Sequence, residues 1–291
     1  MESSPLFRWS KRVAEPEVED WENRLIIDDV SYVIEKTVGL ERWQFSVYGE
    51  DREALEALKR KFGGGVVKVR PEDWQPSATG DMVRLRIRDR FVVVEEAEGD
   101  DLARITAEHP GREVLSFPPQ MAFGTGSHQT TATCLRQLVD ESTQLTPGAW
   151  DLLDLGCGSG ILAIAGKKLG ANRVTAIEND LLALEVAQEN ARRHGVGDAL
   201  EYIGGDAIGW TRDAGAAGQQ FDVIAANLFS DLLVILFPHI PAALAPGGRV
   251  IVSGFLTTQA KAVNEAAQSA GIDLTTFIRR GKWVTAVGRH A

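Results

Sequence analysis

The sequence LLDLGCGSG at residues 152–160 decides the fold of this chain. Its first four residues are mostly apolar and predict a buried strand, and the apolar-rich run 161–169 that follows predicts a helix. Gly156, Gly158 and Gly160 lie between the two, where the backbone must turn tightly and approach a ligand that a Cβ would obstruct. The stretch therefore predicts a ligand-binding loop between a strand and a helix.

The spacing of the glycines narrows the choice of ligand. Dinucleotide sites use G-x-G-x-x-G, with the pyrophosphate on the helix N-terminus, whereas this loop is G-x-G-x-G and one residue shorter. Glu178 closes the next predicted strand, 173–178, and its carboxylate can accept bonds from two ribose hydroxyls. This combination resembles the S-adenosylmethionine (SAM) site of class I methyltransferases. A nicotinamide site and a loop without catalytic role are the alternatives.

Strands and helices alternate along the rest of the C-terminal part, which predicts a parallel sheet. Helices are expected at 161–169, 181–194, 229–244 and 257–270, and strands at 173–178, 200–203, 221–226, 249–253, 273–279 and 282–288. The last two strands are separated only by Arg280 and Gly281, a hairpin-length connection that places an antiparallel strand at the sheet edge. This order resembles the seven-stranded, Rossmann-like architecture of class I methyltransferases, which is the fold we expect.

The N-terminal part predicts a smaller α/β domain. Strands are expected at 6–13, 43–48 and 66–69, helices at 18–38 and 53–62, and a strand pair at 83–87 and 91–94. Residues 95–112 are acidic and contain Gly and Pro, a composition that predicts connecting chain. We therefore expect a substrate-recognition domain at 1–95, a linker at 96–120 and a SAM-binding domain at 121–291.

Composition excludes several classes of protein. No run of 18 apolar residues exists, so no membrane span is expected, and the N-terminus lacks the pattern of a secretion signal. The net charge of −10 disfavours direct DNA binding and favours a small or basic partner, although the carboxylates could equally serve solubility. Cys134 and Cys157 are expected as free thiols of a cytoplasmic protein, Cys157 as a small filler rather than a nucleophile. Two cysteines and five scattered histidines predict no metal site.

Two further segments carry polar side chains toward the predicted ligand crevice. Residues 121–131, MAFGTGSHQTT, have more hydroxyls than one helix cap needs and could fold over a polar ligand. Asn227 ends a predicted strand at the crevice where ligands of open α/β sheets bind. Amine methyltransferases often place Asn or Asp there to orient a substrate nitrogen, and a cap for the following helix is the alternative role.

Three ordered motifs give the chain a specific resemblance: FGTGSHQTT at 123–131, DLGCGSGILAIA at 154–165 and ANL at 226–228. Together they resemble the PrmA family, bacterial methyltransferases of large-subunit ribosomal protein L11. The resemblance implies that the residues holding SAM are Thr130, the loop glycines Gly156, Gly158 and Gly160, Glu178 and Asn227. Asp206 occupies the position where many class I enzymes place a carboxylate near the adenine amine, an ordinary loop residue being the alternative.

The family resemblance also implies a ferredoxin-like N-terminal domain that selects a basic ribosomal protein, and transfer of methyl groups to lysine or N-terminal amines of L11. Two positions depart from the family pattern: Glu178 replaces an aspartate and Gln120 a glycine. No general base is identified. The alternatives are a related enzyme with another protein or small-molecule acceptor and a SAM sensor without turnover. Four tryptophans in this half are expected as core rather than docking residues: Trp9, Trp21, Trp43 and Trp74.

Overall fold

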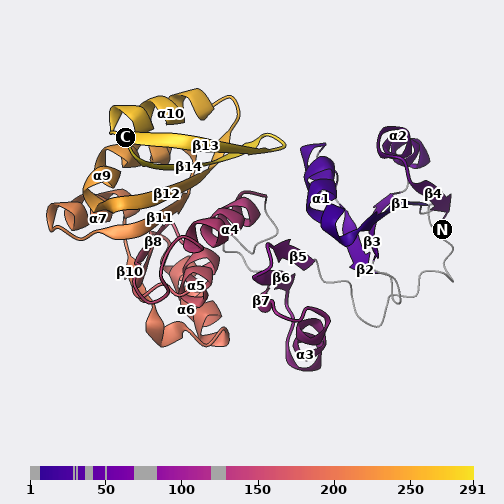
Figure 1. The fold of residues 1–291 in the computed structure, drawn as a ribbon, viewed down its shortest axis with the longest axis horizontal. Coiled ribbons are helices and arrows are strands. Elements are labelled where there is room, and N and C mark those ends of the chain that lie inside the picture. Colours follow the sequence, from indigo (N-terminus) through magenta and orange to yellow (C-terminus); the bar gives the residue numbers. More distant parts are fainter. Residues whose placement is uncertain are drawn as a thin grey trace. The chain divides into compact units, whose positions relative to one another are not determined.

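The computed structural model describes residues 7–28, 30, 32–36, 42–49, 51–68, 84–118 and 129–291. The chain divides into two compact units, Met1–Arg84 and Leu85–Ala291. Figure 1 shows the smaller unit in indigo to purple and the larger unit in purple to yellow.

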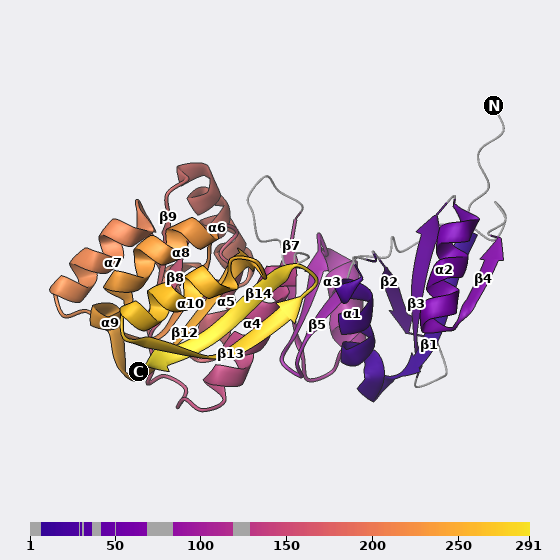
Figure 2. The same cartoon turned by 90° about the horizontal axis from the view of Figure 1, so that it is seen from above.

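The described residues of the smaller unit form a four-stranded antiparallel sheet with two helices. In chain order its elements are β1 (Phe7–Ala14), the 3-10 turn η1 (Glu15–Glu17), α1 (Val18–Ile27), β2 (Val33–Lys36), β3 (Arg42–Gly49), α2 (Arg52–Phe62) and β4 (Gly65–Lys68). The strand order is β2-β3-β1-β4, and each neighbouring pair is antiparallel. This β-α-β-β-α-β arrangement is ferredoxin-like and confirms the expected fold of the N-terminal part. Figure 2 shows α2 lying alongside β3 and β4.

Aromatic side chains fill the core of the smaller unit. Trp9 and Trp43 are buried, and Trp9 donates from Nε1 to the carbonyl oxygen of Gly63 at 2.8 Å. Trp21 of α1 packs edge-on against Phe62 of α2, with ring centroids 6.2 Å apart. These three tryptophans therefore belong to the core, as expected, and Trp74 lies outside the described residues.

The helix expected at 18–38 is too long. The observed helix α1 ends at Ile27, and the later part of this range forms β2, which pairs with β3. Two physical causes account for the difference. Asp28 is unfavourable at the negative end of the helix dipole, and the β-branched Val33 and Ile34 suit a strand.

The larger unit contains the expected seven-stranded sheet. Its strands are β8 (Leu152–Leu155), β9 (Val174–Glu178), β10 (Glu201–Gly204), β11 (Phe221–Asn227), β12 (Leu244–Leu256), β13 (Ile272–Arg280) and β14 (Trp283–His290). The order is β10-β9-β8-β11-β12-β14-β13. The closing hairpin is confirmed, but the antiparallel strand is not at the edge: β14 inserts between β12 and β13 and is antiparallel to both. Because β14 is paired with a strand along each of its edges, β13 is the edge strand of the sheet.

Helices cover both faces of this sheet. One face carries α4 (Gln129–Ser142), α5 (Ile161–Lys168) and α6 (Leu181–Arg193), and the other carries α7 (Ala207–Ala216), α8 (Ser230–Leu236), α9 (Ile240–Ala243) and α10 (Ala260–Ser269). Short 3-10 turns complete the unit: η2 (Gly197–Ala199) and η3 (Phe237–His239). Among the described residues, no helix combines the length and apolar character needed to cross a membrane.

Two of these helices differ from expectation. The single helix expected at 229–244 is divided into α8, η3 and α9, because Pro238 and Pro241 lack the N–H that a continuous helix requires. Helix α7 was not expected at all. Its apolar periodicity is weak, and it is stabilised by the cap that Asp206 provides.

The linker expected at 96–120 is also wrong over most of its length. Residues 99–108 form α3 (Gly99–Glu108), and β7 (Glu113–Phe117) pairs in parallel with β6 (Phe91–Glu95), which neighbours β5 (Arg84–Ile87). The acidic composition that suggested a linker is compatible with a helix, since Asp100 and Asp101 lie at the positive end of its dipole. Buried side chains of this three-stranded sheet share one core with α4 and α5, so the segment belongs to the larger unit.

His194 connects this small sheet to the end of α6. Its ring stacks on Phe117, with centroids 4.9 Å apart, and its Nε2 accepts from the backbone N–H of Ser116 at 3.0 Å. Its Nδ1 lies 2.7 Å from the carbonyl oxygen of Asn190. An accepting Nε2 requires a neutral ring with the proton on Nδ1. Burial is the main cause that lowers the pKa of His194 below its usual value.

We expect His194 to make the larger unit sensitive to acid. Because the folded pKa of His194 is lowered, the unfolded chain binds the extra proton more readily, and stability falls as the pH drops below the unfolded value of about 6.5. Urea unfolding of His194→Gln between pH 7.5 and 5 should show a shallower loss of unfolding free energy than the unsubstituted protein. Parallel pH profiles for the two proteins would contradict this role.

Candidate active site at the carboxyl ends of the central strands

Three of the sequence-predicted segments meet at one edge of the larger sheet. Leu155, the last residue of β8, lies in register beside Ile177 of β9 and Ala226 of β11. Since these strands are parallel, the residues that follow them share that edge. The glycine loop therefore lies between Glu178 and Asn227, which end β9 and β11.

The glycine loop uses backbone conformations that favour glycine. Gly156, Gly158 and Gly160 have φ of 69°, 52° and 78°. A Cβ on Gly156 would lie 2.5 Å from Cδ2 of Leu228. The loop is also held from α6, because Asn190 donates from Nδ2 to the carbonyl oxygen of Ser159 at 2.9 Å. Sequence reasoning missed Asn190, since nothing local marks a buried helix residue as a loop support.

Glu178 is tied to the glycine loop. Its Oε2 accepts from the backbone N–H of Gly158 at 2.9 Å, and its Oε1 accepts from the N–H of Asp180 at 3.1 Å. A carboxylate offers about four lone-pair sites, so both oxygens can accept further bonds. Glu178 is thus oriented by backbone groups and still able to receive ligand hydroxyls.

Asn227 contacts the start of α4. Its Nδ2 lies 3.3 Å from Oγ1 of Thr130 and 3.4 Å from Oγ1 of Thr131. Both threonines are almost fully buried. The Oδ1 of Asn227 is buried and has no hydrogen-bond partner among the described residues. A buried acceptor left open in this way is costly unless a ligand satisfies it, which makes this oxygen a candidate contact for a donor.

Asp206 has a local structural role. It is the N-cap of α7, and its carboxylate accepts from the backbone N–H of Ile208 at 3.1 Å and of Gly209 at 2.9 Å. It follows β10, which pairs with β9, so it lies at the same sheet edge as Glu178. Capping of α7 is sufficient to explain a carboxylate at position 206. The predicted contact of Asp206 with the adenine amine stays a hypothesis.

The loop region also contains two buried groups with altered acidity. Burial raises the pKa of Asp154 to about 7, while the N–H of Ala163, 3.0 Å from its Oδ2, opposes the shift. Sequence reasoning did not include Asp154 among the site residues, although a carboxylate within an apolar strand is a signal. Cys157 is buried, and burial raises the pKa of its thiol well above the usual value. A thiol that resists ionisation suits the filler role better than a nucleophile.

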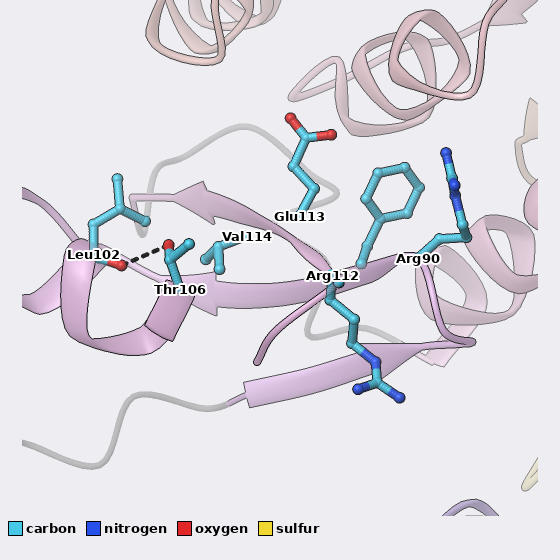
Figure 3. Close-up of a pocket in the computed structure, with 8 residues that line it drawn as sticks. Arg90, Leu102, Thr106, Arg112, Glu113 and Val114 are labelled. Atoms are coloured by element: carbon cyan, nitrogen blue, oxygen red, sulfur yellow. Dashed lines mark hydrogen bonds between the residues drawn. The ribbon is translucent and has the colours of Figure 1, made fainter. Parts of the chain in front are cut away.

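The remaining predicted features lie elsewhere. Residues 121–128 of the segment 121–131 are outside the described residues. Within the described part of the chain, no group of three or more metal-ligating side chains occurs. A hollow of about 450 Å³ lies beside the small sheet and α3 (Figure 3), lined in part by Arg90, Thr106 and Arg112. None of its lining residues was predicted to hold a cofactor, so this hollow is distinct from the glycine-loop site.

The sheet order, the antiparallel β14 and the glycine loop at the carboxyl end of β8 define the class: this is a class I SAM-dependent methyltransferase. The family model described as ribosomal protein L11 methyltransferase (PrmA) matches residues 33–291. The chain belongs to this family.

Individual relatives agree with the family model. A ribosomal protein L11 methyltransferase of Chromohalobacter salexigens is 37% identical over 221 residues, which cover 76% of this chain and 68% of the relative. The corresponding protein of Methylococcus capsulatus is 34% identical, covering 82% and 78%. The crystal structure of ribosomal protein L11 methylase from Lactobacillus delbrueckii subsp. bulgaricus matches 71% of this chain and 98% of that chain, with 26% identity and a TM-score of 0.57.

Proposed function

We propose that this enzyme transfers methyl groups from SAM to amine nitrogens of ribosomal protein L11, on lysine side chains or the N-terminus. The relatives are named for L11 methylation. The observation that carries the amine chemistry is the buried, open Oδ1 of Asn227 beside the glycine loop. An amine donates hydrogen bonds, and a carbonyl-type oxygen is the acceptor that can orient it.

The residues of this edge fit SAM. When bound, SAM supplies an electrophilic methyl on a sulfonium. Glu178 would accept from the ribose hydroxyls, and the glycine loop would let the cofactor approach the backbone, because Gly156, Gly158 and Gly160 carry no Cβ. Thr130 and Asp206 would complete the cofactor site, with Gly158 and Gly160 in the same loop. The carboxylates of Glu178 and Asp206 also give this edge a negative charge, which favours a cationic cofactor.

Asn227 would position the acceptor rather than exchange a proton with it. Thr130 and Thr131 occupy its Nδ2, so Oδ1 is left for an N–H of the incoming amine. The amine must arrive neutral; removing the proton from an ordinary lysine at pH 7 costs about 4.6 kcal/mol. A water-poor site lowers that cost by disfavouring the ammonium form. Alignment of the nitrogen lone pair with the methyl then supplies the main rate advantage.

The proposal predicts a simple binding profile. Isothermal titration should show binding of SAM and S-adenosylhomocysteine and no binding of NAD, because the short glycine loop lacks the dinucleotide spacing. With labelled SAM, purified L11 should take up methyl. Binding of NAD without SAM would overturn the cofactor assignment. SAM binding with no transfer to L11 would indicate another acceptor or a sensor.

Glu178 gives a second prediction. Glu178→Ala should weaken SAM binding by about 1–3 kcal/mol, the range for hydrogen bonds to a charged group, without unfolding the protein. Glu178→Gln keeps one oxygen acceptor and should lose less. Glu185→Ala, on the exposed surface of α6, is the matched control and should bind SAM normally. Unchanged SAM affinity in Glu178→Ala would mean that the ribose is held elsewhere.

A further inference from the structure

Helix α8 exposes an apolar face directly after the proposed acceptor site. Phe229 is 71% exposed, Leu232 40%, Val234 38% and Ile235 55%. We call these four residues the α8 face. The opposite side of the helix packs into the core through Leu233 and Leu236. A surface helix normally carries polar residues on its outer side, so an apolar outer side marks a contact surface.

One acid lies within the α8 face. Asp231 is exposed, and at helical spacing it neighbours both Val234 and Ile235. Its Oδ1 accepts from Oγ of Ser230 at 3.2 Å, and no ion pair to Asp231 is present among the described residues. The surface therefore presents a single negative charge surrounded by apolar side chains. A segment with one cationic side chain and apolar neighbours is complementary to it.

We propose that the α8 face docks the segment of the acceptor protein that surrounds the methylated amine. Continuity supports this occupant, because Phe229 follows Asn227 by two residues and α8 continues from the same strand end. An acceptor segment whose nitrogen reaches Asn227 would therefore pass beside Phe229, where the α8 face begins. Covering this face removes water around the amine, which favours the neutral, reactive form. The inference rests on the proposed function and adds the chemistry of the acceptor segment.

The test separates docking from catalysis. Leu232→Ser/Ile235→Ser in the full chain should raise KM for purified L11 about ten-fold or more, while kcat at saturating L11 and the SAM affinity stay within about two-fold. Asp231→Asn should also raise KM and should reduce its dependence on salt. Phe277→Ser is the matched control, since Phe277 is 45% exposed on the edge strand β13, and its KM should not change.

Other results would overturn the proposal. If the unsubstituted enzyme methylates L11 and the double variant has the same KM, the docking role of the α8 face is rejected. The proposed function would still stand. An equal rise in Phe277→Ser would show a nonspecific effect of lost apolar surface. A dimer in the unsubstituted protein that becomes a monomer in the double variant, with KM unchanged, would assign the face to a second copy. Absence of L11 methylation by the unsubstituted, SAM-binding protein would reject the proposed function, and the docking proposal with it.

Discussion

Asn227→Ala should reduce kcat for L11 methylation by about 100- to 1,000-fold, the range for removing one preorganised polar contact from an active site. The substitution deletes the open Oδ1 that would orient the amine, and it also releases the hydroxyls of Thr130 and Thr131. SAM affinity should fall much less than kcat, because Glu178 and the glycine loop stay intact. Single-turnover methyl transfer at saturating SAM measures the effect.

Asn227→Asp is the informative comparison. It keeps an oxygen at the position of Oδ1 and loses the N–H donors, so activity should fall between those of the unsubstituted protein and Asn227→Ala. Thermal unfolding should show that both variants fold, since Asn227 is at a strand end and not in the apolar core. Full activity in Asn227→Ala would show that Asn227 does not orient the amine and serves only as the last residue of β11.

Removal of the smaller unit should have the second large effect. A fragment of residues 85–291 should bind SAM as the full chain does but methylate L11 with kcat/KM reduced about 100-fold or more, equivalent to about 2.7 kcal/mol of lost binding free energy. We propose the smaller unit as the substrate selector because it has its own core and holds none of the residues assigned to the SAM site. The comparison is made at equal SAM occupancy.

The starting residue of the fragment is decided by packing. A fragment beginning at 121, the boundary expected from the sequence, would omit Phe91, Leu115 and Phe117, which are buried in the core shared with α4 and α5. That fragment should be less stable than 85–291 and serves as a control for folding. Equal methylation of L11 by 85–291 and by the full chain would show that the smaller unit is not the selector.

The pattern of neighbouring residues was sufficient to predict those elements whose conformation is decided by neighbouring residues. The glycine loop, the strand–helix alternation and the Arg280–Gly281 hairpin depend on turn conformation and side-chain periodicity, so they could be predicted from neighbouring residues. The errors arose where distant contacts decide. Residues 33–36 became a strand because β3 offers a partner, and the acidic segment 99–108 became a helix because Ile105 is buried where α3 packs beside β7.

The sequence by itself determined the fold class and which strand ends carry glycine, Glu178 and Asn227. Only the tertiary structure decided that Asn227 meets Thr130 and Thr131, almost one hundred residues earlier, and that its Oδ1 is left open. It also decided that Asp154 is buried enough to raise its pKa to about 7. Hydrogen bonding and desolvation depend on which distant groups surround an atom, and spacing along the chain does not encode that arrangement.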